Sequence, residues 1–227
     1  MEIMVDKFDW SKHSRTVMKT DQDIISAIIK LHNGGRNFDV DPTYSTGRFW
    51  QGLTPPKYKF DINPQTEGVV QASAEKLPLE NESVDSIMFD PPFVVRPRLS
   101  ETGIIANRFS HFTNIENLWT FYYKALKEFY RILTPKGIVA FKCQDTIDGG
   151  NEYWSHNAII EMAEEFGFHL RDIMLLHREL VMFSPNMKIQ QHARKTHCYY
   201  LVFEKLGKGK SKWRNILDKV KEKEHGE

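Results

Sequence analysis

Apolar residues recur along the chain in two periods, which predict a layered fold of helices and strands. Apolar positions at helical spacing predict a helix over 23–31, capped by Thr20 or Asp21 and ended by Gly34 and Gly35. The same spacing predicts helices over 114–133 and 154–166. Short apolar runs, each bounded by turn residues, predict strands at 38–40, 58–62, 69–72, 83–89, 138–143, 170–176 and 196–204.

The order of these elements favours an α/β fold with a parallel sheet, because strands alternate with helices and several strands are apolar throughout. The spacing is uneven in the first half of the chain. About 16 residues separate the first two strands and about six separate the next two, which is too short for a crossover helix. We therefore expect shortened helices there, with Phe49 and Trp50 helping to cover one sheet face.

Composition sets limits on the class of protein. The 227 residues carry a formal net charge of +1 and are 41% hydrophobic, which is enough for a sizeable core and too much for a disordered chain. The charged first ten residues do not suit a signal peptide, and no apolar stretch suits a membrane span, so we expect a cytoplasmic protein. Two cysteines without zinc-type spacing predict neither a disulfide framework nor a metal site. We expect an arm over 1–19, one domain over 20–204 and a charged tail over 205–227.

One short motif carries the clearest chemical signal. Residues 90–93 read Asp-Pro-Pro-Phe and directly follow the apolar strand predicted at 83–89. That places them at the carboxyl end of a central strand, where open α/β sheets bind ligands. The alternative is a plain turn, since proline after aspartate ends a strand in any protein.

The motif resembles the signature of the amino-methyltransferases, which methylate exocyclic nitrogens of nucleobases with S-adenosylmethionine. In that family the signature reads Asp/Asn/Ser-Pro-Pro-Tyr/Phe/Trp, and the Asp-Pro-Pro-Phe form is similar to that of DNA adenine-N6 methylases. The resemblance covers residues 20–204. It implies a class I, Rossmann-like methyltransferase fold with a mostly parallel sheet, helices on both faces and a final antiparallel strand.

The resemblance also assigns roles at the catalytic loop. An exocyclic amine is a poor nucleophile because its lone pair is delocalised into the ring. Asp90 and the carbonyl of Pro91 would accept its two N–H bonds, while the two prolines, including Pro92, stiffen the loop. Phe93 would stack on a base taken out of its helix.

A cofactor site is implied by three further segments. Residues 38–47 resemble a degenerate form of the family motif Asp-Pro-Phe-x-Gly-x-Gly, an acid ends the strand at 58–62, and residues 71–79 resemble the segment that borders the adenine ring. Ser45 stands at the first glycine of that motif and Ser73 at the usual adenine-side aspartate. The expected cofactor contacts are Asp39, Asp41, Pro42, Tyr44, Gly47, Asp61, Ser73 and Ala74.

Nucleic acid is the expected partner, because basic and amide side chains cluster in the two loops that flank the base pocket. A solvated loop is the alternative interpretation. The expected contacts are Arg96, Arg98, Arg108, Lys142, Arg194 and Lys195, with a second basic strip over 205–214.

Adenine N6 in DNA is the favoured target in this interpretation. Guanine N2 in RNA and cytosine N4 in DNA stay open as alternatives. Outside the enzymes, so does a nucleic-acid-binding module with a degenerate cofactor site, because of Ser45 and Ser73. The sequence leaves open whether the chain forms a homodimer.

Overall fold

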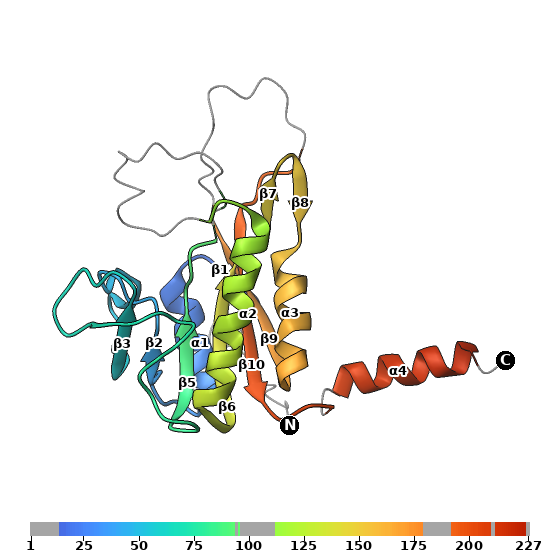
Figure 1. Ribbon diagram of the computed structural model, residues 1–227, viewed down its shortest axis with the longest axis horizontal. Coiled ribbons are helices and arrows are strands. Elements are labelled where there is room, and N and C mark those ends of the chain that lie inside the picture. Colours follow the sequence, from blue (N-terminus) through green and yellow to red (C-terminus); the bar gives the residue numbers. More distant parts are fainter. Residues whose placement is uncertain (1–13, 94, 96–111, 179–191, 210–211, 226–227) are drawn as a thin grey trace, which may run out of the picture.

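The computed structural model describes residues 14–93, 95, 112–178, 192–209 and 212–225, which fold around one eight-stranded sheet (Figure 1). The elements, in chain order, are β1 (Val17–Met18), α1 (Asp21–His32), β2 (Val40–Asp41), η2 (Arg48–Trp50), β3 (Tyr58–Asp61), β4 (Val70–Gln71), β5 (Val84–Phe89), α2 (Ile115–Ile132), β6 (Leu133–Cys143), β7 (Thr146–Asp148), β8 (Asn151–Tyr153), α3 (Ser155–Phe166), β9 (Phe168–His177), β10 (His197–Lys205) and α4 (Lys212–His225).

The strand order in the sheet is β1-β9-β10-β6-β5-β2-β3-β4. β10 runs antiparallel to both of its neighbours, β6 and β9, and the other neighbouring pairs are parallel. The expected mostly parallel sheet with a final antiparallel strand is therefore confirmed. β7 and β8 form a separate antiparallel pair that the sequence pattern did not predict.

Helices cover both faces of the sheet, as expected. α2 and α3 lie together over one face, in front of the sheet in Figure 1, and α1 lies behind it. On the α2 side, Phe89 of β5 packs edge-to-face against Phe129 and Phe141, with ring centroids 4.9 and 4.8 Å away. On the α1 side, Trp50 is buried beside Ile24 and Ile28, so η2 replaces a full crossover helix as the strand spacing predicted.

Local sequence explains where the helices begin and end. The side chain of Thr20 accepts a hydrogen bond from the N–H of Asp23 at 3.1 Å, which caps α1 as predicted. α3 ends at Gly167, whose φ of 102° lies in the left-handed region. A Cβ at that glycine would lie 2.7 Å from the backbone of Gly207, so the close approach of these two segments requires glycine.

The two ends of the chain contain regular structure, where the sequence predicts an arm and a charged tail. Val17 and Met18, expected in a loose arm, form β1 and pair with Leu175 and Leu176 of β9. The charged tail contains α4, which projects away from the sheet in Figure 1.

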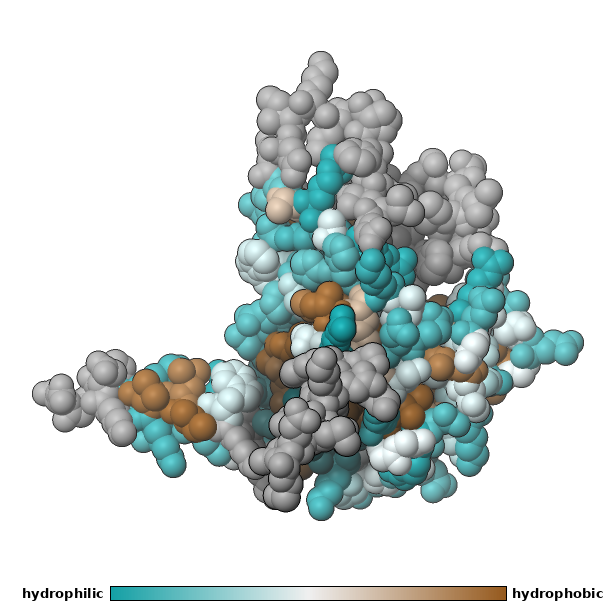
Figure 2. Space-filling view, turned by 180° about the vertical axis from the view of Figure 1, so that it is seen from behind, coloured by the Kyte–Doolittle hydropathy of each residue, from teal (hydrophilic) through white to brown (hydrophobic). Residues whose placement is uncertain are grey.

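α4 presents an apolar stripe to solvent, visible in brown along the helix in Figure 2. Ile216 and Val220 belong to this stripe and are 63% and 52% exposed. Within the described residues, no helix has the length and apolar content that a bilayer span requires.

Candidate active site

Two loops meet at the carboxyl ends of the neighbouring strands β2 and β5, which pair at Val40 and Ile87. The first loop, residues 41–47, contains the expected cofactor motif, and the second contains residues 90–93. A single side chain joins them: the hydroxyl of Thr43 accepts a hydrogen bond from the N–H of Asp90 at 3.2 Å and contacts Oδ1 of Asp41 at 3.2 Å. The structure therefore brings the predicted cofactor loop and the predicted catalytic loop together.

Asp90 lies beside a buried ammonium group. Phe89 of β5 pairs with Phe141 of β6. The residues that follow them, Asp90 and Lys142, are therefore neighbours. The Nζ atom of Lys142 lies 3.3 Å from the Asp90 carboxylate and 2.8 Å from Oδ1 of Asp21, the first residue of α1. Asp21, Lys142 and Asp90 thus form a row of alternating charge at the base of the site.

The environment of Asp90 acts in two directions. Burial raises the pKa of the Asp90 carboxyl above its ordinary value, while the Lys142 ammonium opposes that rise. The Asp90 side chain keeps 26% of its surface exposed. Asp90 is therefore a shielded hydrogen-bond acceptor that stays partly exposed.

The remaining residues of the motif are held from both sides of the sheet. The Tyr122 hydroxyl of α2 donates to the carbonyl of Pro92 at 3.2 Å, and Pro91 is buried. Phe93 packs against the core cluster on the α1 side, as do Tyr44 and Phe49. The loop therefore has contacts with the core on both faces of the sheet.

Asp41 holds the cofactor loop from inside. Its carboxylate accepts hydrogen bonds from Trp50 Nε1 at 2.7 Å and from the N–H of Thr43 at 2.8 Å. Burial raises the pKa of Asp41 to about 7, and the nearby Asp90 charge adds to the rise. Because these donors already occupy its carboxylate, the structure places Asp41 as the support of the loop.

The loop turns through two left-handed residues. Ser45 has φ of 50° and Gly47 has φ of 73°. A Cβ at Gly47 would lie 2.7 Å from the ring of Tyr44, so a side chain there would have to displace that ring as well as adopt a strained φ. Ser45 stands where the family motif has glycine, and its positive φ gives the physical reason for that glycine.

Asp61 ends β3 next to this loop. Its two carboxylate oxygens accept the N–H groups of Ser45 and Asn63, each at 2.8 Å. Each oxygen has a second lone pair that can accept a hydroxyl group. An acid at this strand end, facing a glycine-requiring turn, fits the ribose of a nucleoside cofactor.

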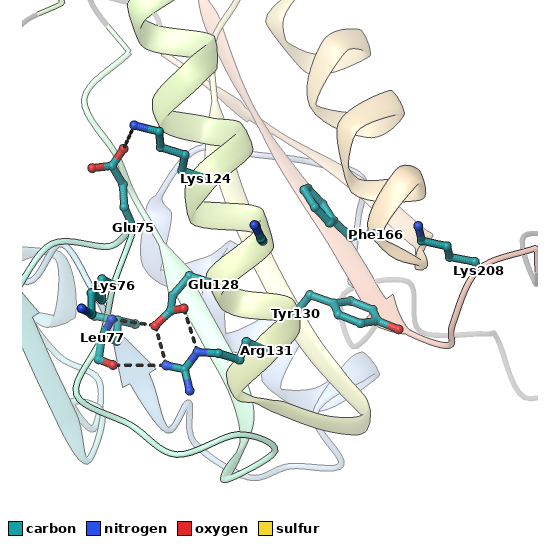
Figure 3. Close-up of a pocket in the computed structure, with 10 residues that line it drawn as sticks. Glu75, Lys76, Leu77, Lys124, Glu128, Tyr130, Arg131, Phe166 and Lys208 are labelled. Atoms are coloured by element: carbon teal, nitrogen blue, oxygen red, sulfur yellow. Dashed lines mark hydrogen bonds and ion pairs between the residues drawn. The ribbon is translucent and has the colours of Figure 1, made fainter.

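The segment expected to border the adenine ring is anchored from α2. Ser73 accepts the N–H of Glu75 at 3.2 Å, and Ala74 is buried. Just beyond it, Glu128 accepts the N–H of Leu77 at 2.7 Å and pairs with Arg131 at 2.6 Å, as Figure 3 shows. Leu77, Glu128 and Arg131 line a groove at the side of α2, and their contacts hold the end of the 71–79 segment.

Other predicted site residues lie elsewhere. Asp39 precedes β2, at the opposite end from the site, where its Oδ2 accepts the N–H groups of Asp85 and Ser86 at 2.8 and 3.0 Å. It aligns β2 with β5, so the structure gives it a role in strand pairing.

The expected nucleic-acid contacts are only partly placed. Arg96, Arg98 and Arg108 lie outside the described residues. Lys195 pairs with Glu152 of β8 and lies 5.1 Å from the ring centroid of Trp154. Arg194 is half-buried in the segment before β10.

Sequence reasoning missed two members of the site. The sequence predicts Asp21 only as a helix cap, and an acid in the first helical turn is common for that reason alone. Thr43 replaces the Phe of the family motif, and only the fold shows that its hydroxyl spans both loops.

A comparison with protein families gives the family of the chain. The sequence model of the N6/N4 methyltransferase family, described as DNA methylase, matches residues 84–227, more than half of the chain. A search of curated proteins finds no significant match.

One of the solved structures similar to this chain supports the fold. A protein from Galdieria sulphuraria, described as a putative sarcosine dimethylglycine methyltransferase, matches with a TM-score of 0.52 at 15% identity, covering 83% of this chain and 86% of that one. TrmN from Thermus thermophilus matches with a TM-score of 0.49 at 19% identity, over 81% of this chain and 48% of its own.

A protein from Thermus thermophilus, described as a putative DNA modification methylase and complexed with S-adenosyl-L-methionine, matches with a TM-score of 0.40 at 19% identity. The match covers 57% of this chain and 51% of that one. The chain thus spans about half the length of both Thermus thermophilus proteins.

Proposed function

This chain belongs to the N6/N4 methyltransferase family of DNA methylases, and from that membership we propose that it methylates the N6 amine of adenine in DNA. The reaction is S-adenosylmethionine-dependent methylation. S-adenosylmethionine, when bound, supplies an electrophilic methyl group. The nucleic-acid substrate and the base are the parts of the proposal that need an experiment.

The observation that carries the proposal is the Thr43 hydroxyl, which joins the two loops of the site. Transfer between two bound molecules depends mainly on their relative position. A direct link between the loop that would hold the methyl donor and the loop that would hold the amine sets that position. Asp61 and the turn at Gly47 would hold the donor, with Ser73 at its adenine side.

The catalytic loop supplies acceptors for the amine. An ionised Asp90 accepts one N–H bond of the exocyclic amine, which favours a pyramidal nitrogen with its lone pair directed at the methyl group. The proposal assigns the second N–H to the carbonyl of Pro91, because the Pro92 carbonyl already accepts the Tyr122 hydroxyl. Phe93 would stack on the base.

Tritiated S-adenosylmethionine and unmethylated DNA test this function. We expect Asp90→Ala to lower the turnover number by a factor on the order of 100 or more, equivalent to about 3 kcal/mol, while S-adenosylmethionine affinity measured by calorimetry is retained. Asp85→Ala is the matched control, because Asp85 lies on the same strand at its far end. Near-normal turnover in the Asp90 variant would contradict the mechanism.

The product identifies the base. Mass spectrometry of nucleosides from treated DNA and treated RNA separates N6-methyladenine from N4-methylcytosine and from N2-methylguanine. Methyl groups found only on RNA, or only on another amine, would replace the proposed target and leave the role of Asp90 intact.

A further inference from the structure

Lys142 is buried although it is charged. It is one of two lysines below a tenth exposed among the described residues, and its side chain is only 5% exposed. Its Nζ atom lies 5.0 Å from the ring centroid of Phe49 and 5.6 Å from that of Tyr200. The sequence predicts this lysine as a nucleic-acid contact that lines the base pocket, and an ammonium group enclosed in this way is out of reach of a phosphate backbone.

Asp21 anchors Lys142 more firmly than Asp90 does. The Nζ atom is 2.8 Å from Asp21 and 3.3 Å from Asp90. Asp21 also accepts the Tyr200 hydroxyl and lies 3.1 Å from Arg178. These donors and the start of α1 fix the Asp21 carboxylate, so the position of Nζ is set from the side away from the substrate.

We propose that Lys142, held by Asp21, is a positioning residue for Asp90: it fixes the orientation of the Asp90 carboxylate and keeps it ionised inside the site. The catalytic meaning of this assignment rests on the proposed function, and the electrostatic part stands on the geometry alone. Asp21 and Lys142 then belong to the active site although neither touches the substrate.

A purely structural ion pair explains the arrangement less well. Asp21 alone would neutralise Lys142, and buried ion pairs generally add little net stability compared with apolar residues of the same size. The second carboxylate in contact with Nζ belongs to the motif residue itself. The Lys142 ammonium group therefore lies where it stabilises the ionised Asp90 carboxylate.

The surrounding charges make Asp90 depend on Lys142. Asp21 on α1 and Asp41 on the cofactor loop are the acids beside it, and both disfavour a further negative charge. Among the described residues, the other titratable or charged groups that face the cluster are Tyr122 of α2, Tyr200 and Cys198 of β10, and Arg178 beyond β9. Without the ammonium, Asp90 takes up a proton and can no longer accept an amine N–H at that oxygen.

The test is a ¹³C NMR titration of aspartate carboxyl groups in the full chain, with the Asp90 signal assigned through Asp90→Asn. We expect Lys142→Met to raise the Asp90 midpoint by about one pH unit or more and Lys142→Arg to restore it. Lys205→Met is the matched control, since Lys205 is also buried and paired, with Glu82, at the far end of the sheet. An unchanged midpoint in folded Lys142→Met would overturn the proposal.

Asp21→Asn separates the effect of Lys142 on the charge of Asp90 from its effect on the position of Asp90. The same variant tests the proposal if Lys142→Met does not fold. Removing the Asp21 charge leaves Lys142 to Asp90 alone, so the Asp90 midpoint moves down. We nevertheless expect turnover to fall by about tenfold or more, because the ammonium loses its anchor. Full turnover in Asp21→Asn would overturn the positioning role.

Turnover against pH distinguishes this inference from the proposed function. In Lys142→Met, the rise of the turnover number on the acid side of its pH profile moves to higher pH, because the Asp90 carboxyl group must lose its proton before it can accept the amine. If Asp90→Ala keeps its turnover, the proposed function fails and the titration result still stands. If Asp90→Ala is inactive and the limb of Lys142→Met does not move, only the present inference fails.

Discussion

Thr43→Val is the most direct test of the contact between the two loops. Valine has nearly the shape of threonine, so the change removes the hydroxyl and leaves the volume. Two contacts are lost: the bond that the Asp90 N–H donates to Thr43 Oγ1 and the contact of that hydroxyl with Asp41. The Thr43 N–H keeps its bond to Asp41, so the turn itself has support.

The magnitude follows from those two contacts. A hydrogen bond to a charged carboxylate is worth roughly 1.5–3 kcal/mol, and a buried donor left without a partner costs about 1–3 kcal/mol. Since Asp41 keeps its bond from Trp50, we expect the lower part of both ranges. The free energy of unfolding should fall by roughly 2.5–4 kcal/mol.

Urea denaturation and the tritium assay measure the two consequences. The turnover number should fall by about tenfold or more, because the loops no longer share a fixed spacing. Thr43→Ser is the control, since it keeps the hydroxyl and loses only a methyl group. We expect it to retain most of the turnover.

One outcome would refute the reasoning. If Thr43→Val loses stability while its turnover stays equal to that of Thr43→Ser, the bridge holds the fold and does not set the geometry of transfer. The two loops would then be coupled through other contacts, such as the packing of Phe93 and Tyr44 against the same core cluster.

Two further predictions concern the acids of the cofactor half. Asp61→Ala should weaken S-adenosylmethionine binding by about 1–3 kcal/mol, measured by calorimetry, and an unchanged affinity would move the ribose contact elsewhere. Asp41 has a folded pKa of about 7, above its ordinary value of 3.8, so its contribution to stability is present at low pH and is lost as pH rises through about 7. As pH rises from about 4 to about 7, the free energy of unfolding of the natural chain should therefore fall relative to that of Asp41→Asn, by on the order of 4 kcal/mol at most. A constant difference between the two proteins in urea denaturation across that range would contradict this.

The sequence predicts most of the fold because its signals are local. Thr20 caps α1 and Gly167 ends α3 at the expected positions, and apolar runs mark the central strands. The short β1 and the pair β7 and β8 escaped prediction, since two or three residues give no period to read.

In the candidate site, too, the sequence predicts the local motif and misses the contacts between distant residues. Residues 90–93 form a contiguous motif, so sequence alone places them at a strand end. The partners of Asp90 come from α1 and β6, far apart in the chain, and no spacing rule joins Asp21 to Lys142. Asp39 was grouped with the cofactor motif because it is near in sequence, yet it lies at the far end of β2.

Both edge strands of the sheet are short. β1 and β4, at the two edges, have two residues each, whereas β6, β9 and β10 in the interior have 11, 10 and 9. Exposed edges are templates for pairing with another chain, and a two-residue edge offers only a few backbone groups. β1 covers only Leu175 and Leu176 of β9, so within the described residues the earlier part of β9 is a long backbone edge without a neighbouring strand on that side.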